Sequence, residues 1–235
     1  MIKKKEFTLL SNRMINATKR IYRKGILSGI GGNISVRTSV PETILCSPSG
    51  IPIMDMLVDD ICIVDISSIS EDKYRVLQGR YNPTSEILLH GGIYRMRPEI
   101  KAVLHTHPPI TTAFSCTTHE VNYKIQEDLR WYIGEVESIP FIYSSSKALA
   151  EVALPKLTKN YALILKNHGI FALGDCLLEA VTITELIEDL SKIYYHSMII
   201  GNGEVVELPK AYWTDVQIEP RKDLIYNDEV LDQCH

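Results

Sequence analysis

Three histidines are the residues whose types and spacing most clearly predict chemistry. His105 and His107 lie two residues apart in a run, 100–107, that predicts a strand, so both side chains project from the same face. His168 directly follows a second predicted strand, 161–166. Three neutral imidazoles with one open position form a common catalytic zinc site, and the open position lets the ion act as a Lewis acid. The pattern therefore predicts a divalent ion, expected to be zinc.

The alternative is that these are ordinary buried, hydrogen-bonded histidines, because an H-x-H pair also arises by chance. The choice of zinc over manganese or cobalt rests on ligand type alone. His90 and His196 fall inside predicted helices, where we expect core residues or residues that support the site. His119 falls in a predicted loop and His235 is the last residue, so we expect neither to bind the metal.

Three clusters of small polar residues, at 31–35, 47–50 and 84–85, precede the histidine pair and could bind a phosphate. The first two could present backbone amides to an anion, although the glycine-rich cluster follows a helix and does not match a dinucleotide fingerprint. The third is predicted to begin a helix, with Asn82 as cap and Pro83 at the first position, where unpaired amides attract phosphate. Each cluster alone also fits an ordinary loop or cap, but together they favour a phosphate cradle.

Two glutamates are candidates for proton transfer. Glu86 directly follows the third cluster, so it could lie between the phosphate and the metal. There it could be a fourth ligand, or the base that removes a proton beside a polarised carbonyl; the alternative is a first-turn glutamate that stabilises the helix dipole. Glu127, in the polar run 124–128, is the second candidate, and its alternative is an ordinary surface charge.

Composition limits the class of protein. The chain has 235 residues, 45% hydrophobic and 23% charged, as in a globular protein with one sizeable core. Its net charge of −4 gives no support for nucleic-acid binding. Five scattered cysteines without a C-x-x-C pair favour reduced thiols in a cytoplasmic protein. We expect no secretory signal and no transmembrane segment, because no apolar run reaches about 18 residues.

Helices and strands that must position these residues alternate along the chain. Predicted helices cover 7–24, a segment from 82 that ends before Pro98, and 176–200, capped by Asp175. Predicted strands cover 43–46, 61–66, 100–107 and 161–166. Interleaved elements favour a layered α/β or α+β fold. Without a linker or repeat, residues 1–235 are expected to form a single domain.

In this order the motifs resemble those of the class II aldolase/adducin family. The match consists of Gly32-Asn33-Ile34-Ser35, Ser47-Pro48-Ser49-Gly50, Thr84-Ser85-Glu86, His105-Thr106-His107 and Asn167-His168-Gly169, within residues 7–200. Five ordered motifs are specific for the family but not for one member. Members include L-fuculose-1-phosphate and related aldolases, L-ribulose-5-phosphate 4-epimerase, methylthioribulose-1-phosphate dehydratase, sugar-acid phosphate decarboxylases and non-catalytic adducin heads.

The resemblance implies an α/β fold, a three-layer αβα sandwich with a central mixed, largely antiparallel sheet. It implies zinc on the three histidines and a homotetramer with active sites at subunit interfaces. The aldolases carry a glutamate at the position of Glu86, as metal ligand and acid/base, whereas the epimerases carry an aspartate, so the resemblance favours an aldolase. The residues implied to bind the substrate phosphate are Asn33, Ser49, Gly50, Thr84 and Ser85.

Two departures from the aldolase pattern keep other reactions open. The aldolases carry a tyrosine after the second metal histidine that protonates the leaving aldehyde, but the nearest tyrosine here is Tyr123 and the expected position holds Gln126. Gln126 and Glu127 instead resemble the Gln-Glu pair of the methylthioribulose-phosphate dehydratases, in which the glutamate is the acid/base. A C-terminal residue such as Tyr212 is a further candidate donor.

The expected function is that of a zinc-dependent aldolase, a lyase of carbohydrate metabolism. It would cleave a ketose 1-phosphate, similar to L-fuculose 1-phosphate, to dihydroxyacetone phosphate and an aldehyde through a metal-stabilised enediolate, with Glu86 moving the proton. The alternatives are a dehydratase or decarboxylase of the same family, with Glu127 as acid/base, a 4-epimerase of that family, or an adducin-like binding head. The expected partner is a small sugar phosphate, with no nucleic acid and no membrane.

Overall fold

An eight-stranded sheet forms the centre of the structure, a computed structural model that describes residues 2–27, 29, 31–127, 133–214 and 227–233. Its strands are β1 (Asn33–Arg37), β2 (Thr43–Cys46), β3 (Cys62–Asp65), β4 (Arg75–Gln78), β5 (Ala102–Thr106), β6 (Glu137–Ile139), β7 (Ala162–Leu165) and β8 (Gly169–Gly174). Across the sheet they run in the order β4-β3-β2-β1-β5-β8-β7-β6. Neighbouring strands are antiparallel except β6 and β7, which are parallel.

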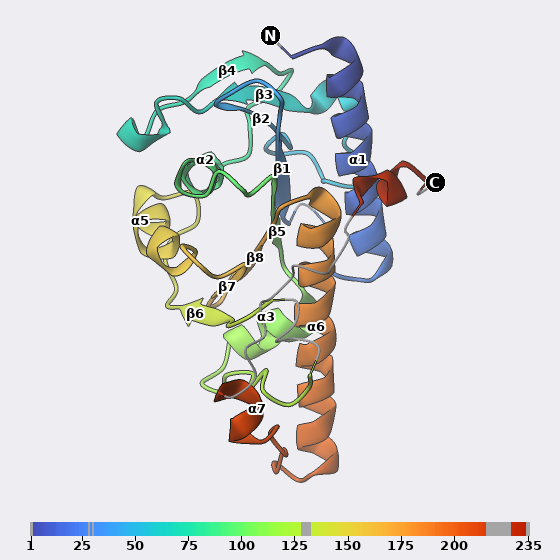
Figure 1. The fold of residues 1–235 in the computed structure, drawn as a ribbon, viewed down its shortest axis with the longest axis vertical. Coiled ribbons are helices and arrows are strands. Elements are labelled where there is room, and N and C mark those ends of the chain that lie inside the picture. The colour runs from blue at the N-terminus through green and yellow to red at the C-terminus, as the bar shows by residue number, and fades with distance from the viewer. Residues whose placement is uncertain (1, 28, 30, 128–132, 215–226, 234–235) are drawn as a thin grey trace.

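Helices cover both faces of this sheet (Figure 1). On one face lie α2 (Ile87–Met96) and α5 (Lys147–Lys156), and on the other lie α1 (Lys4–Arg23) and α6 (Leu177–Ile200). The shorter helical segments are η1 (Val58–Asp60), η2 (Ile69–Glu71), α3 (Pro109–Ser115), α7 (Lys210–Thr214) and η3 (Asp228–Gln233). The predicted three-layer αβα sandwich around a mixed, largely antiparallel sheet is therefore confirmed.

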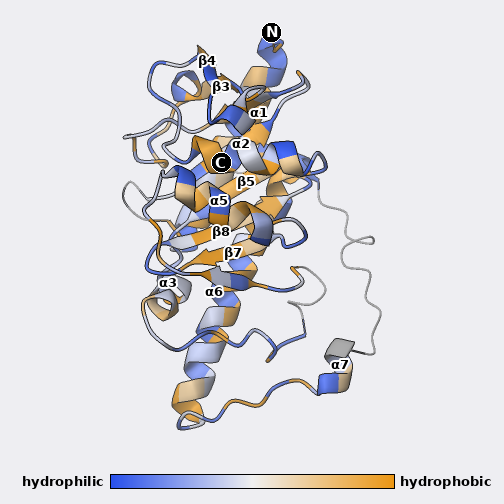
Figure 2. Ribbon diagram, turned by 90° about the vertical axis from the view of Figure 1, so that its left-hand side faces the viewer, coloured by the Kyte–Doolittle hydropathy of each residue, from blue (hydrophilic) through white to orange (hydrophobic). Residues whose placement is uncertain are grey.

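The alternation of side chains along β5 shows how the sheet separates two apolar layers. Val103 packs into the cluster under α2 and α5, whereas Leu104 packs into the cluster under α1 and α6. Apolar residues are concentrated along β5, β7 and β8, between the two helical layers (Figure 2). Because side chains two residues apart share a face, His105 lies on the same face as Val103, toward α2.

The predicted strands and long helices are present with small shifts in their bounds. The strand predicted at 43–46 is β2, and those at 61–66, 100–107 and 161–166 shorten to β3, β5 and β7. Helix α1 ends two residues before Gly25, which takes a φ of 71°. Cys176, rather than Asp175, is the N-cap of α6, and the amide of Leu178 donates to the Asp228 carboxylate at 2.8 Å.

The helix predicted from Asn82 onward is wrong in its first turn. Helix α2 begins only at Ile87, and Pro83 lies in an extended bridge with Pro48. The amide of Thr84 donates to the carbonyl of residue 47 at 3.0 Å, and the amide of residue 49 donates to Asn82 at 2.8 Å. These bonds hold the segment extended against the 47–50 loop, so Thr84 and its neighbour precede the helix instead of forming its first turn.

Two expectations from composition can be compared with the structure. No helix in the described part of the chain is long and apolar enough to cross a membrane. Among the described residues, free thiols are present at Cys46, Cys62, Cys116 and Cys176. Reduced thiols were expected from the sequence. Cys234 and His235 lie outside the described residues.

Candidate metal and active site

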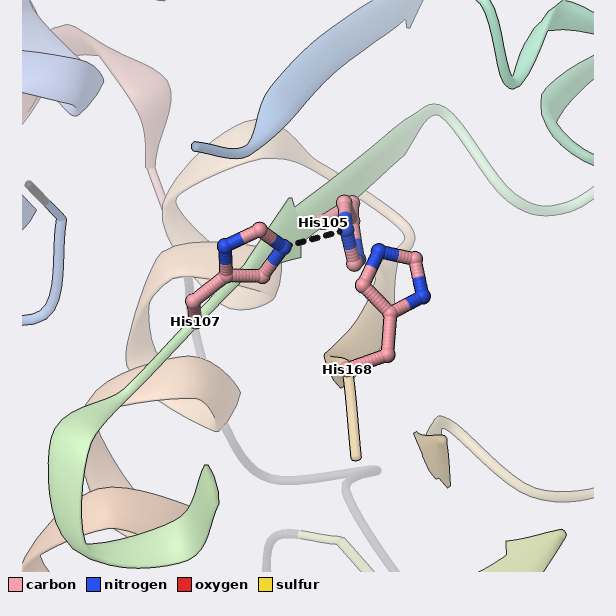
Figure 3. Close-up of side chains that lie close together, drawn as sticks. All are labelled: His105, His107 and His168. Atoms are coloured by element: carbon pink, nitrogen blue, oxygen red, sulfur yellow. Dashed lines mark hydrogen bonds between the residues drawn. The ribbon is translucent and has the colours of Figure 1, made fainter. Parts of the chain in front are cut away.

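The three histidines converge although they come from two separate parts of the chain. His105 is the fourth residue of β5 and pairs with Asn33 on β1 and with Phe171 on β8. His107 lies just beyond the end of β5, and His168 lies in the tight turn between β7 and β8. One ligand nitrogen of each imidazole lies within 4.8 Å of the other two, and the Nε2 atoms of His105 and His107 are 3.0 Å apart (Figure 3). The sheet therefore gathers the predicted ligands in one place.

Backbone contacts fix the orientation of the central ring. The Nδ1–H of His105 donates to the carbonyl of Ile170 at 2.9 Å, which leaves the Nε2 lone pair directed into the site. The ring also stacks on Phe171 with a centroid distance of 4.7 Å. A Cβ at Gly169 would collide with the carbonyl of Thr106 and the ring of His107. The close approach of the turn to β5 thus requires a glycine.

Burial keeps these ligands in the state that binds metal. It lowers the pKa of His105 to about 3 and that of His107 to about 4, because the low-dielectric surroundings disfavour the charged imidazole. Both rings are therefore neutral at pH 7. Two nitrogens bound to one tetrahedral zinc at 2.0–2.1 Å lie about 3.3 Å apart, close to the 3.0 Å between the two Nε2 atoms. The donor set fits a zinc-like cation.

Glu86 completes the same group from the N-cap of α2. Its Oε2 lies 3.5 Å from Nε2 of His105, and its Oε1 lies 3.9 Å from Nε2 of His168. Burial raises its pKa, while the side-chain amide of Asn33, which donates to Oε2 at 3.0 Å, opposes that shift. No described residue donates a hydrogen bond to the buried Oε1. An orphaned buried oxygen beside three imidazoles is a further indication that a cation fits here.

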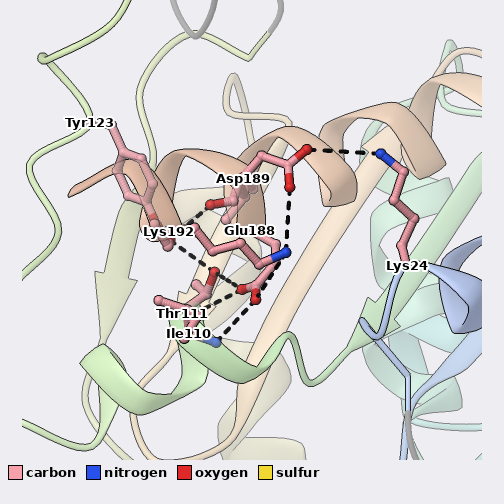
Figure 4. Close-up of polar contacts among 9 residues, drawn as sticks. Lys24, Ile110, Thr111, Tyr123, Glu188, Asp189 and Lys192 are labelled. Carbon is pink, nitrogen blue, oxygen red and sulfur yellow. Dashed lines mark hydrogen bonds and ion pairs between the residues drawn. The ribbon is translucent and has the colours of Figure 1, made fainter. Parts of the chain in front are cut away.

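A buried carboxylate supports the segment that follows His107. Glu188, on α6, accepts hydrogen bonds from the amide of Ile110 at 3.1 Å and from the amide and hydroxyl of Thr111 at 3.0 and 2.9 Å (Figure 4). These groups form the first turn of α3, whose amides have no partner within the helix. Glu188 thereby ties the chain after His107 to the rigid α6.

The predicted phosphate clusters lie side by side at the other end of the site. Strand β1 pairs with β2, and the loop after β2 pairs with the segment before α2. Ser49, Gly50 and Ser85 are exposed, whereas Thr84 is buried. Gly50 takes a φ of 79°, which favours glycine. The side chain of Asn33 is directed toward Glu86. The clusters are adjacent, but their phosphate contacts stay a prediction.

A positively charged side chain at the phosphate end, that of Arg80, was not predicted from the sequence. A hollow of about 480 Å³ is lined by the predicted phosphate residue Ser49 and by Arg80 and Asn82, among others. Arg80 lies in an exposed stretch between β4 and α2. No motif surrounds it, so only the fold reveals that it faces the loop containing Ser49.

Other candidates are not brought to the histidines. Glu127 lies in an exposed turn, and within the described ranges no hydrogen bond or ion pair joins it to them. The hydroxyl of Tyr123 is buried and lies 3.2 Å from that of Ser191, so it belongs to the packing between the strands and α6. Tyr212 lies on α7, beyond the end of α6 and away from the sheet (Figures 1 and 2). His196 is exposed on α6, so the prediction of a core or supporting role is wrong for it.

Comparisons with known proteins place this chain among named relatives. The family model described as "Class II Aldolase and Adducin N-terminal domain" matches residues 12–195. A protein of Bacillus thuringiensis named 5-deoxy-D-ribulose 1-phosphate aldolase is 29% identical over 80% of this chain and 85% of its own length. One of Methanococcus vannielii named L-fuculose phosphate aldolase is 31% identical over 74% of this chain and 88% of its own length. One of Haemophilus influenzae named 3-oxo-tetronate 4-phosphate decarboxylase is 28% identical over 77% of this chain and 85% of its own length.

Solved structures show the same fold. An L-fuculose 1-phosphate aldolase superposes with a TM-score of 0.74 at 28% identity and covers 89% of this chain and 93% of its own. YgbL of Escherichia coli superposes with a TM-score of 0.79 at 25% identity and covers 91% of this chain and 100% of its own.

Proposed function

The chain belongs to the class II aldolase and adducin family, and from this premise we propose that it is a zinc-dependent lyase that cleaves a ketose 1-phosphate. The observation that carries the proposal is the convergence of three imidazoles and one buried carboxylate at the end of β5. A purely binding member of the family has no need of buried neutral ligands beside an orphaned carboxylate oxygen. Perturbed titratable groups of this kind are typical of catalytic sites.

Each group has a distinct task in this proposal. His105, His107 and His168 would hold the ion, which supplies positive charge to stabilise the negative charge that develops when a carbon–carbon bond of the substrate breaks. Glu86 carries the proton for the carbon left behind, because it is the carboxylate nearest to the histidines. Burial raises its pKa, which favours uptake of a proton by this carboxylate more than in an exposed glutamate.

The phosphate end would orient the substrate. Asn33, Ser49, Gly50, Thr84 and Ser85 remain the proposed contacts, and Arg80 adds a charge on the same side. Binding energy from a phosphate remote from the reacting bond helps to align that bond with the metal end. The homotetramer and the cytoplasmic location remain predictions.

A second candidate is decarboxylation of a phosphorylated sugar acid. The relative named as a 3-oxo-tetronate 4-phosphate decarboxylase supports it, since its identity to this chain is nearly that of the aldolases. Both reactions leave negative charge on a carbon next to a carbonyl, so one metal site serves either. The aldolase is preferred because two of the three relatives described above are named aldolases.

Product analysis tests the proposal. The purified protein, loaded with zinc, is incubated with ketose 1-phosphates and with phosphorylated sugar acids, and the products are identified by mass spectrometry. An aldehyde together with dihydroxyacetone phosphate is expected from at least one ketose. Release of carbon dioxide instead identifies the decarboxylase. One bound zinc per chain with no turnover of any compound contradicts both and favours a binding head.

A further inference from the structure

A chain of buried hydrogen bonds reaches Glu86 from the interior of the protein. The oxygen Oε2 of Glu86 accepts from Nδ2 of Asn33 at 3.0 Å, and Oδ1 of Asn33 lies 2.5 Å from Nε2 of His90. The hydroxyl of Ser35 lies 2.7 Å from Nδ1 of His90 and 2.9 Å from the hydroxyl of Tyr94. All five side chains are buried.

The periodicity of two elements creates this chain. Glu86, His90 and Tyr94 are spaced by four residues, so they share one face at the start and along the length of α2. Asn33 and Ser35 are spaced by two and share one face of β1. Packing α2 on the sheet interleaves the two sets, and each of their side-chain polar atoms except Oε1 of Glu86 meets a partner.

The contact between Asn33 and Glu86 fixes the direction of every other bond. Nδ2 of Asn33 donates to Oε2 of Glu86, so the amide presents its NH2 group to Glu86 and turns its oxygen away. That oxygen can accept only from an N–H at Nε2 of His90. Burial lowers the pKa of His90 to about 3, so the ring is neutral and its Nδ1 must accept from Ser35.

The last link then follows. Ser35 has one proton and gives it to His90, so its oxygen accepts from the hydroxyl of Tyr94, whose own pKa is raised by burial. The opposite direction would place the carbonyl of Asn33 against Oε2 of Glu86. It would need a proton on that oxygen.

Given the proposed function, we propose that His90 is a positioning residue, which holds the amide of Asn33 so that its NH2 group binds Oε2 of Glu86 and leaves Oε1 for the reaction. Among the described residues the hydrogen bonds of His90 go to Ser35 and Asn33, and none joins it to the three metal-site histidines. It acts through Asn33 on Oε2, the oxygen 3.5 Å from Nε2 of His105, whereas Oε1 lies 3.9 Å from Nε2 of His168. The other oxygen, Oε1, accepts no hydrogen bond from any described residue.

The first test reads the ring directly and needs no substrate. In the metal-free protein with 15N-labelled histidine, long-range 1H–15N correlations distinguish the two neutral tautomers. The proposal expects a proton on Nε2 and a lone pair on Nδ1 for His90, with the assignment made from the His90→Gln variant. A proton on Nδ1, or a charged ring at pH 7, overturns it.

The second test separates positioning from packing. His90→Leu removes the donor and is expected to lower kcat about 10- to 100-fold, as for other residues that orient active-site groups, while KM and the zinc content stay near wild type. His90→Gln restores an N–H near the position of Nε2 and should recover most of this loss. Tyr94→Phe removes only the distal link and should change kcat by less than about threefold.

A matched control comes from α6. Thr184 is buried, and among the described residues its hydroxyl donates only to the carbonyl of Ala180 in its own helix, at 2.9 Å. Thr184→Val should lower the melting temperature without changing kcat. Equal losses of kcat in the leucine and glutamine variants of His90 contradict positioning. A wild-type protein that turns over no sugar phosphate contradicts the proposed function, and the tautomer result is then still decisive for His90.

Discussion

The metal end and the phosphate end of the candidate site are built in different ways. Regular structure anchors the metal end: His105 lies in a central strand, 2% exposed, Glu86 caps a helix, 4% exposed, and the other two histidines lie directly beside strand ends. The phosphate end consists of loops apart from Asn33 on β1, and Ser49 and Gly50 are exposed there. Side chains held by a sheet and a packed helix keep their geometry without substrate, whereas loop residues exchange water contacts for substrate contacts.

This difference predicts a division of effects. Changes at the metal end should alter metal retention, kcat and stability together, because the side chains that hold the metal are also buried in the core. Changes at the phosphate end should alter KM with little effect on the fold. Four experiments test that division, beginning with the largest expected effect.

His105→Ala should abolish the metal site. The substitution removes the central ligand, and the two remaining histidines cannot hold the ion alone. We therefore expect almost no zinc after dialysis and a loss of kcat/KM of at least about 10³-fold. Metal analysis and steady-state kinetics are the measurements. His119→Ala, in an exposed loop, is the control and should match wild type. A variant of His105 that keeps one zinc and full turnover would show that the site is elsewhere.

The metal-free protein should lose stability as the pH falls from 7 to 5. The folded pKa values are about 3 for His90 and His105 and about 4 for His107, below the ordinary 6.5, so below pH 6.5 the unfolded chain binds protons that the folded chain does not. Each of the three should contribute roughly 2 kcal/mol of lost stability over this range. Urea denaturation at both pH values measures the loss. In His90→Gln about a third of this loss should disappear, and an unchanged pH dependence would refute the assignment.

Glu188→Gln tests the support behind His107. The amide cannot accept all the hydrogen bonds that the carboxylate receives from Ile110 and Thr111, so the free energy of unfolding should fall by about 1–3 kcal/mol. Zinc affinity should weaken as well, since α3 follows His107. Chelator competition and urea denaturation measure the two. Asp189→Asn, at a half-exposed neighbour, should change stability by less than about 0.5 kcal/mol.

Ser49→Ala should have the smallest effect. It removes one exposed hydroxyl from the proposed phosphate end, so KM should rise about 3- to 10-fold while kcat and the melting temperature stay near wild type. Steady-state kinetics with the identified substrate measures it. Arg80→Gln should behave in the same direction. A fall in kcat with unchanged KM for both variants would mean that the phosphate binds elsewhere.

Local patterns determined much of this protein. Short runs rich in β-branched residues predicted the strands, and glycines after helical runs predicted the ends of α1 and α6, because these signals act within a few residues. Two histidines on one strand face needed only the period of a strand to be predicted as neighbours. Five motifs in order were enough for the resemblance to the family.

Only the tertiary structure decided which distant residues meet. The bridge between Pro48 and Pro83 overrides the local helix signal at Asn82, because pairing with another loop satisfies the same backbone groups that a helix would. The fold places Arg80 beside Ser49, and packing α2 on β1 interleaves the spacing of four in Glu86, His90 and Tyr94 with that of Asn33 and Ser35. Both spacings can be read in the sequence, but nothing local tells that the two elements pack face to face. Burial and contact, which set the pKa values and the direction of that hydrogen-bond chain, arise only once the sheet and helices assemble.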